Sequence, residues 1–245
     1  AIDKGLDFIS VVGNARGGSR IVAGTSLDLK PEDFKGLKAL IESWKRQGKK
    51  FRVGASRGSV NEALGRLQFE HHGIDTDKDI EIVNIPRFED HPQALHSGSV
   101  QMIFAWEPAG TVAAITGYGR TFAYPYDHPA GALNTIWLTT RRYESANAAL
   151  MQKFVDAVYL AGDFLKANPD TKLKDVVEFT GLKEDIAREA LRNSWLDLKP
   201  DLKAAQVLAA LNAKLGWTSK DVSADLPKAM EMRYVTDMEA KRKKR

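Results

Sequence analysis

Apolar positions along the first 140 residues form short runs that alternate with stretches of helical spacing. Short apolar runs bounded by glycine, proline or polar residues are typical of buried strands, whereas apolar residues three or four positions apart are typical of one helix face. Strands are predicted at Leu6 to Val12, Ser19 to Gly24, Phe51 to Ala55, Asp79 to Ile85, Val100 to Ala105 and Asn134 to Thr140. The intervening helices are predicted to begin at Pro31, near Val60, at Asp90 and at Trp106 to Pro108. This alternation predicts an α/β fold.

The remaining segments are predicted to be loops and helices. Ala1 to Gly5 is interpreted as the last turn of a helix, and Gly13 to Gly18 as a loop in which Gly17 and Gly18 permit positive φ. Tyr118 to Tyr126 is interpreted as loop and short strand. After Arg142 the pattern becomes helical, and the clearest helices are predicted at Ala148 to Ala167, Leu173 to Phe179, Lys183 to Asn193 and Asp201 to Leu215. The sequence therefore predicts an α/β protein with an appended helical run.

The stretch from Phe51 to Leu67 combines a strand, the polar turn Ser56-Arg57-Gly58-Ser59 and a helix. The backbone N–H groups of a first helical turn have no partners inside the helix, and the macrodipole places partial positive charge there. Such a turn suits an anionic or polar ligand, and Arg57 adds a cation. The alternative is that Ser59 only caps the helix and Arg57 lies in solvent. The stretch is not a phosphate loop, because no GxxxxGK[ST] motif occurs.

Charge and cysteine content limit the possible functions. The net charge is +4, but the last five residues, 241–245, contribute +5, so the rest of the chain is near neutral and composition does not support nucleic-acid binding. This basic tail is interpreted as a solvated helix end, with a nucleic-acid or acidic-lipid contact as the alternative. The absence of cysteine excludes disulfides, thiolate metal sites and a cysteine nucleophile. It also fits an oxidising compartment.

No apolar run approaches the roughly 20 residues needed to span a bilayer, and no charged-then-apolar leader opens the chain. A signal peptide is therefore expected to have been removed or never included. The five histidines do not form a metal-binding set: His71 and His72 are adjacent, and His91 and His96 are five apart rather than four. No cofactor, metal site or catalytic residue is predicted. Asp127-His128 is a candidate polar ligand contact.

Seven segments in fixed order resemble one protein family. They are KGLDFISVVGN, GGSRIVAG, PEDFKGL, FRVGASRGS, DIEIVNIP, ALHSGSVQMIFAWEP and FVDAVYLAGDFLKANP, and together they extend over roughly Gly5 to Tyr234. Each segment alone is weak evidence, but their order along the chain resembles that in the two-lobed extracytoplasmic solute-binding proteins of ABC importers. The similarity is to the branch that binds aliphatic sulfonates, taurine, nitrate and thiamine-pyrimidine precursors. The most specific passages are PEDFKGL to GASRGS and SGSVQMIFAWEP.

The resemblance implies a type II periplasmic-binding-protein-like fold in which a ligand is held between two lobes joined by crossing strands. The crossings correspond to Ser19 to Leu29 and to Asn134 to Thr140. Lobe I is expected to comprise 1–29 and 134–245, and lobe II 30–133. Family members carry strands and helices before the position that matches Ala1, so the N-terminal part of lobe I is expected to be missing, about 70 to 90 residues or half a typical domain.

The resemblance also implies the ligand contacts, and each has a physical use. The helix end and Arg57 suit an anion, Trp106 offers a flat face, and asparagine side chains complete hydrogen bonds that a desolvated ligand would otherwise lose. Glu107 would repel an anion, so it either pairs with Arg57 or an arginine of the helical part, is structural in the first turn of its helix, or indicates an amine-bearing or heterocyclic ligand. The expected ligand-binding residues are Gly13, Asn14, Ser56, Arg57, Gly58, Ser59, Asn61, Trp106, Glu107, Asn134 and Thr135.

The implied function is capture of a small polar or anionic organic molecule and its delivery to the permease subunits of an ABC importer. The chain is expected to be periplasmic or extracytoplasmic, to contact no nucleic acid, and to meet the membrane only through the permease or a lipid anchor. An enzyme on the same fold is disfavoured, because the pyrimidine synthases that resemble this family use a cysteine-rich motif and this chain has no cysteine. A sensory or interaction module is a third possibility.

Overall fold

A computed structural model describes residues 2–243, and it divides the chain into two compact units. Unit 1 contains the chain up to Gly17, from Ala132 to Glu184 and from Ser194 onward, and unit 2 contains 18–131 and 185–193. The chain therefore passes from one unit to the other four times. Ala1 of the predicted first helical turn, and the last two residues of the basic tail, lie outside the described residues.

These units differ from the predicted lobes in three segments, 18–29, 132–133 and 185–193. The segment 18–29 belongs to unit 2, because β2 (Ser19–Gly24) pairs with β5 (Met102–Trp106) and β6 (Gly119–Ala123) of that unit. Ser19 to Leu29 is therefore not a crossing segment, and the passage falls at Gly17 and Gly18, which both have the predicted positive φ. The segment 185–193 also belongs to unit 2.

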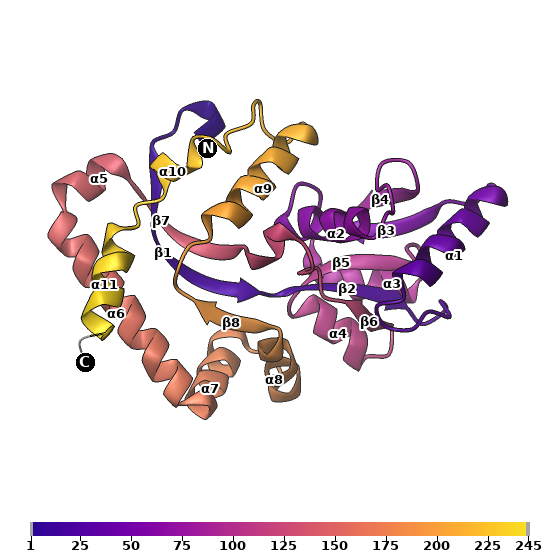
Figure 1. The fold of residues 1–245 in the computed structure, drawn as a ribbon. Coiled ribbons are helices and arrows are strands. Elements are labelled where there is room, and N and C mark those ends of the chain that lie inside the picture. The colour runs from indigo at the N-terminus through magenta and orange to yellow at the C-terminus, as the bar shows by residue number, and fades with distance from the viewer. Residues whose placement is uncertain (1, 244–245) are drawn as a thin grey trace. The chain divides into compact units, whose positions relative to one another are not determined.

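Unit 2 is built on a five-stranded sheet in the order β4-β3-β5-β2-β6 (Figure 1). β3 (Phe51–Ala55) is parallel to both β4 (Ile80–Asn84) and β5, whereas β2 is antiparallel to both of its neighbours. Every residue of β2 is buried, as its apolar sequence predicts. The sheet is thus a mixed one with parallel strands on one side.

Helices of unit 2 pack their apolar faces on this sheet. The main core joins Phe34 and Leu37 of the first helix to Phe51 and Val53 of β3 and to Phe104 of β5. The helices are α1 (Phe34–Arg46), α2 (Val60–His71), α3 (His91–His96), α4 (Ala109–Ile115) and α8 (Glu184–Arg192), with short 3-10 turns η2 (Phe88–Asp90) and η3 (Pro129–Ala132). The predicted elements of this region are confirmed, with boundaries shifted by a few residues.

Unit 1 contains a three-stranded antiparallel sheet in the order β7-β1-β8. β1 (Phe8–Gly17) pairs along its first part with β7 (Asn134–Thr140), and its last four residues pair with β8 (Ser194–Asp197). The predicted loop from Gly13 to Gly18 is therefore wrong: the chain stays extended to Gly17 because a strand about 180 residues later supplies its hydrogen bonds.

The helices of unit 1 cover this sheet around a second core that includes Ile9, Val155, Tyr159 and Val235. The predicted basic tail lies partly in the last of these helices, and Lys241 and Arg242 form ion pairs of 2.9 and 2.5 Å with Asp156 and Asp163. No described helix is long and apolar enough to span a membrane. The helices are η1 (Ile2–Lys4), α5 (Arg141–Ala146), α6 (Ala148–Ala167), α7 (Pro169–Thr180), α9 (Leu202–Lys214), α10 (Leu226–Ala229) and α11 (Arg233–Lys243).

Stability is expected to fall as the pH drops below about 6.5, partly because of His91. Its ring is fully buried, and burial lowers its pKa from the ordinary value of 6.5, although a 3.0 Å hydrogen bond between Nε2 and the Ile85 carbonyl opposes this shift. Below pH 6.5 the unfolded chain binds a proton at His91, whereas the folded chain does not. The contribution of neutral His91 to the free energy of unfolding is therefore complete above pH 6.5 and is lost progressively as the pH falls from 6.5 towards the lower pKa of the folded protein. Burial also lowers the pKa of His128.

Urea unfolding between pH 7.5 and 5.5 measures this dependence. In His91→Phe, which keeps a ring of similar size, the free energy of unfolding is expected to depend less steeply on pH. An unchanged slope in that variant would assign the pH dependence to other groups.

Candidate functional site

The predicted ligand residues of unit 2 gather at one edge of its sheet. β3, β4 and β5 are parallel, so their carboxyl ends lie at the same edge, and β2 begins there because Ser19 pairs with Trp106. Ligands of α/β sheets bind outside the carboxyl ends of strands, where consecutive loops leave room for them. The loop after β3 supplies Ser56, Arg57, Gly58, Ser59 and Asn61, and the end of β5 supplies Trp106 and Glu107.

Hydrogen bonds hold these loops to neighbouring strands. The backbone N–H of Arg57 donates to Asn84 Oδ1 at 3.0 Å, which ties the turn after β3 to the end of β4. The N–H of Glu107 donates to the Gly18 carbonyl at 2.8 Å, which ties the end of β5 to the start of β2. The edge is therefore a connected surface rather than a set of independent loops.

The first turn of α2 is occupied by side chains of its own segment. Ser59 Oγ accepts from the N–H of Glu62 at 3.2 Å, which is the capping role given as the alternative. Glu62 Oε2 accepts from the N–H of Gly58 at 2.8 Å, so a carboxylate already lies at the positive end of the helix. Arg66 Nε lies 2.9 Å from Glu62 Oε1 and balances this charge. Arg57 is exposed, and its guanidinium is 3.5 Å from the Ile82 carbonyl.

Glu107 pairs with a buried arginine that precedes it by 87 positions in the sequence. Arg20 Nε lies 2.7 Å from Glu107 Oε1, and the Arg20 side chain is only 2% exposed. Arg20 also donates to Thr121 Oγ1 at 3.0 Å and lies over the ring of Tyr124 at 5.4 Å. Glu107 Oε2 accepts from the N–H of Thr111 in α4 at 3.0 Å. The predicted pairing with Arg57 or with an arginine of the helical part is wrong, because Arg20 of β2 is the partner.

A buried hydrogen-bond network continues from Glu107. Asn193 Nδ2 donates to Glu107 Oε1 at 3.2 Å and to the Ser19 carbonyl at 3.0 Å. Ser19 Oγ donates to Asn61 Oδ1 at 2.7 Å, so Asn61 is engaged within the protein. The Tyr126 hydroxyl accepts from the N–H of Ser19 and lies 3.0 Å from Asn193 Oδ1. Burial raises the pKa of Tyr126 to about 12, so the phenol keeps its proton for this network.

Among the predicted ligand contacts of unit 2, Trp106 has an indole face that a ligand could reach. Its ring is half-buried, and the Cβ position of Gly18 lies 3.7 Å from two ring atoms. A Cβ at position 18 would only be in van der Waals contact with the indole, so it is the positive φ of Gly18 that disfavours a side chain there. The close backbone approach leaves Trp106 supported on one side and partly open to a ligand.

The sequence reasoning missed Arg20, Tyr126 and Asn193. Arg20 carried a signal, because it is a charge within the otherwise apolar run SRIVAG and a buried charge needs a partner. Asn193 carried none, because it lies in the helical part of the chain, 174 positions from the Ser19 carbonyl that it contacts. Only the folded chain brings these residues to the predicted edge.

The predicted residues of unit 1 cluster where β1 lies between β7 and β8. Gly13 donates its N–H to the Leu198 carbonyl, and a Cβ at this position would lie 2.4 Å from the Asp197 carbonyl oxygen. The Asn134 amide donates to two carbonyls of the Asp197 to Lys199 segment. Thr135 Oγ1 exchanges hydrogen bonds with the backbone of Ala15, whereas the neighbouring Asn14 is exposed.

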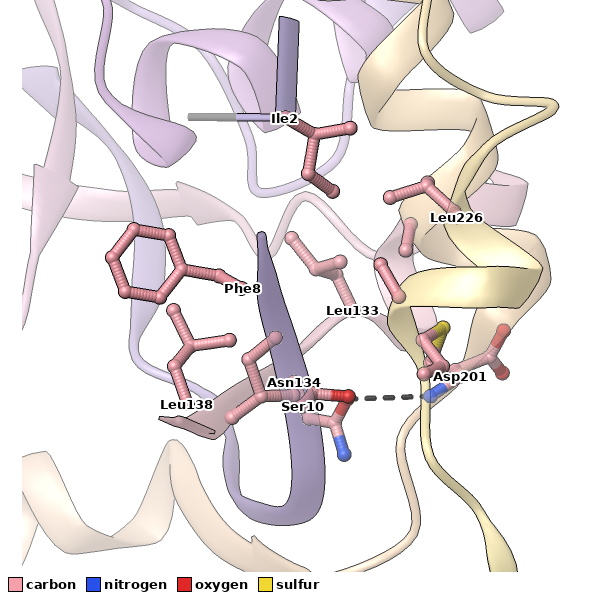
Figure 2. Close-up of a pocket in the computed structure, with 12 residues that line it drawn as sticks. Ile2, Phe8, Ser10, Leu133, Asn134, Leu138, Asp201 and Leu226 are labelled. Atoms are coloured by element: carbon pink, nitrogen blue, oxygen red, sulfur yellow. Dashed lines mark hydrogen bonds between the residues drawn. The ribbon is translucent and has the colours of Figure 1, made fainter. Parts of the chain in front are cut away.

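Unit 1 also contains a mostly apolar pocket of about 210 Å³ beside Asn134. Figure 2 shows Phe8, Leu133 and Leu138 around it, with the 3.4 Å hydrogen bond from the Asp201 N–H to Asn134 Oδ1. Asp201 also caps α9 by accepting from the N–H of Ala204. Asn134 and Asp201 are engaged with the backbone, whereas the buried Oγ of Ser10, which also lines the pocket, has no hydrogen-bond partner among the described residues. The pocket therefore offers a ligand mainly apolar contact and one hydroxyl group.

The described residues contain no group of three histidine, aspartate or glutamate side chains placed to hold a metal ion. The candidate contact Asp127 accepts from Gln68 Nε2 at 2.9 Å, and Gln68 in turn lies 3.2 Å from His72 Nε2. His128 is buried. Asp127-His128 is therefore part of the packing between α2 and the loop after β6.

Three known proteins illustrate the similarity of this chain to others. The putative binding protein YtlA of Bacillus subtilis (strain 168) is 22% identical over 197 residues, which are 79% of this chain and 58% of YtlA. The periplasmic aliphatic sulphonate binding protein SsuA from Escherichia coli has the same fold, with a TM-score of 0.78, 18% identity, and 96% of this chain matched to 77% of that one. The desulfurization enzyme DSZB shares the fold, with a TM-score of 0.65, 14% identity, and 96% of this chain matched to 80% of DSZB.

These matches confirm the predicted α/β periplasmic-binding-protein-like fold, and about a quarter of the E. coli protein has no counterpart in residues 1–245. A family model also matches the sequence from residue 1 to 179, which is well over half of the chain and includes every predicted ligand residue. The chain belongs to the NMT1-like family.

Proposed function

We propose that this protein is the solute-binding component of an ABC import system. The observation that carries the proposal is the carboxyl edge of the unit 2 sheet, where the turn at Ser56 to Asn61 and the half-buried Trp106 meet. The E. coli protein with the same fold is a periplasmic aliphatic sulphonate binding protein, which supports the proposal. The name of the Bacillus subtilis relative, a putative binding protein, agrees.

The proposed ligand is a small polar or anionic organic molecule of the sulfonate, taurine, nitrate or pyrimidine kind. Arg57 is the exposed cation at the edge, and Trp106 offers a flat apolar face. Glu107 does not oppose an anion, because Arg20 compensates its charge.

The proposed partners and location follow from the same role. A solute-binding component delivers its ligand to permease subunits, so a permease is the proposed protein partner. The proposed location is periplasmic or extracytoplasmic, with membrane contact only through the permease or a lipid anchor. No nucleic-acid partner is proposed.

Ligand binding is expected to stabilise the protein against heat. A ligand at 100 times its dissociation constant adds about 2.7 kcal/mol to the free energy of unfolding, so one class in a panel of sulfonates, taurine, nitrate and pyrimidines should raise the melting temperature. Trp106→Ala is expected to weaken binding at least about tenfold, because the flat face is lost.

Arg57→Ala distinguishes anionic from neutral ligands. It should weaken binding of an anion and leave a neutral pyrimidine unaffected. Arg52→Ala removes an arginine near the opposite, amino end of β3, whose side chain is 51% exposed, and serves as the matched control. A panel that produces no shift, in a protein that still melts cooperatively, would count against the transport role.

An enzyme is the second candidate, because the desulfurization enzyme DSZB shares the fold. A binding protein returns its ligand unchanged, whereas an enzyme converts it. Recovery of the ligand from the complex, followed by mass spectrometry, separates the two. A sensory or interaction module would bind a ligand with no permease in the same gene neighbourhood.

A further inference from the structure

Asn193 follows α8 and lies at the carboxyl edge of the unit 2 sheet, beside the start of β2 and the end of β5. It ends the segment 185–193, which belongs to unit 2 although the chain on both sides of it belongs to unit 1. Only 4% of its surface is exposed. A buried amide has to satisfy its donors and its acceptor within the protein, because water does not reach them. The partners of Asn193 therefore show what this returning segment does in unit 2.

Four contacts join Asn193 to this edge. Its Nδ2 donates to the Ser19 carbonyl at 3.0 Å and to Glu107 Oε1 at 3.2 Å. Its Oδ1 lies 3.0 Å from the Tyr126 hydroxyl, and its backbone carbonyl accepts from the N–H of Gly18 at 2.6 Å. The amide is thus used up by contacts within unit 2. Asn193 holds the protein together at this edge rather than offering a group to a ligand.

The residues that Asn193 holds are those that support Trp106. Ser19 is the β2 residue paired with Trp106, and Glu107 follows it directly and donates its N–H to the Gly18 carbonyl. The Cβ position of Gly18 lies 3.7 Å from the indole ring. Asn193 therefore fixes the backbone opposite, beneath and after Trp106, and it acts on the indole through these three residues.

We propose that Asn193 is a positioning residue for the indole face on which unit 2 receives its ligand. The inference rests on the proposed function, in which Trp106 contacts the ligand. Without the Asn193 amide, the Ser19 carbonyl and the Glu107 carboxylate lose a buried donor that joins β2 to the end of β5. The indole then loses the fixed support that holds its face in one orientation.

Asn193→Asp tests this role, because aspartate has nearly the same shape and keeps an oxygen for the Tyr126 hydroxyl. It replaces the donor Nδ2 with an oxygen that faces two acceptors. In protein labelled with 5-fluorotryptophan, each of the five tryptophans gives a fluorine NMR signal, and Trp106→Phe identifies the signal of Trp106. In the ligand-free variant this signal is expected to shift or broaden, whereas the signal of Trp44 in α1 is expected to stay.

Phe51→Leu is the control for a general loss of stability. It leaves a cavity in the core of unit 2 at the amino end of β3, away from the ligand edge. The Phe51 and Trp44 ring centroids are 5.7 Å apart, so the Trp44 signal is expected to move and the Trp106 signal to stay. Asn193→Ala removes the same donors without adding a charge, and it carries the test if the aspartate variant does not fold.

Ligand affinity provides the second readout. The sulfonates, taurine, nitrate and pyrimidines of the thermal panel are titrated into the natural chain and the two variants by calorimetry. For a compound that binds the natural chain, Asn193→Asp is expected to raise the Kd about three- to tenfold, which corresponds to one or two lost hydrogen bonds. Phe51→Leu is expected to leave the Kd unchanged.

The outcomes separate this inference from the proposed function. A Trp106 signal that stays in place in Asn193→Asp and in Asn193→Ala would overturn the positioning role, as would the same Kd in the natural chain and Asn193→Asp. Either result leaves the binding function intact. If the Trp106 signal moves but no compound binds the natural chain, the transport proposal fails, whereas the hold of Asn193 on Trp106 is confirmed.

Discussion

Replacing Glu107 with glutamine is expected to lower the free energy of unfolding of unit 2 by about 3–5 kcal/mol. The substitution removes the negative partner of Arg20, whose guanidinium is almost fully buried and lies 2.7 Å from the Glu107 carboxylate. A buried cation without a partner is costly because neither water nor another charge compensates it. Urea unfolding, with hydrogen exchange of the β5 amides as the readout for unit 2, measures the loss.

An exposed ion pair provides the control for this prediction. Lys78 lies 2.8 Å from Asp75, and both side chains are largely in solvent. Lys78→Gln is expected to change stability little, since exposed pairs are weak and screened by salt. If Glu107→Gln were as mild as this control, the buried Arg20 would have to be compensated by another group, and Glu189, 3.9 Å from the Arg20 guanidinium, is the candidate. The double variant Arg20→Met with Glu107→Gln is expected to recover most of the lost stability, because it removes both charges and keeps a side-chain oxygen that can accept from Asn193.

The second large effect is expected from Gly65→Ala in α2, at about 2 kcal/mol of destabilisation. A Cβ on Gly65 would lie 2.4–2.6 Å from three atoms of the Phe104 ring. Phe104 is buried and packs edge-on against Phe69 at 5.1 Å, so it has little room to move. The overpacking outweighs the gain of up to about 1 kcal/mol from alanine's greater helix propensity.

Gly162→Ala in α6 is the matched control, because it changes a second helical glycine in a different environment. The nearest atom to its Cβ would be the end of the flexible Leu198 side chain at 3.1 Å. This variant is expected to be neutral or slightly stabilising in thermal unfolding. Equal stability of the two variants would mean that α2 shifts on the sheet more easily than its packing indicates. Adding Phe104→Leu to Gly65→Ala should relieve part of the strain.

The local pattern of the sequence was sufficient to predict most elements. β2 is fully buried and β3 is buried apart from Arg52, so both runs are mostly apolar with one arginine each, and α1 carries its apolar residues on one face. The turn from Ser56 to Ser59 was predicted to precede a helix because serine is a strong cap, and Ser59 does cap α2. These features depend on contacts between residues close in sequence.

The gathering of candidate ligand residues at the sheet edge was predicted only through the family resemblance. The structure supplies a physical reason for unit 2: the parallel direction of β3 and β5 brings their following loops together. The role of these residues in binding stays a prediction. For Asn61 and Glu107, the structure adds that their side chains are held by Ser19, Arg20 and Asn193.

The sequence by itself determined the order of strands and helices, the α/β class, and the capped turn after β3, because periodicity and capping are local properties. Tertiary structure alone decided that Gly13 to Gly17 continue β1, that Arg20 neutralises Glu107, and that Asn193 completes their network. The partners in these contacts are between 86 and about 180 positions apart. No local pattern encodes such pairings, because they form only when the remote segments pack together.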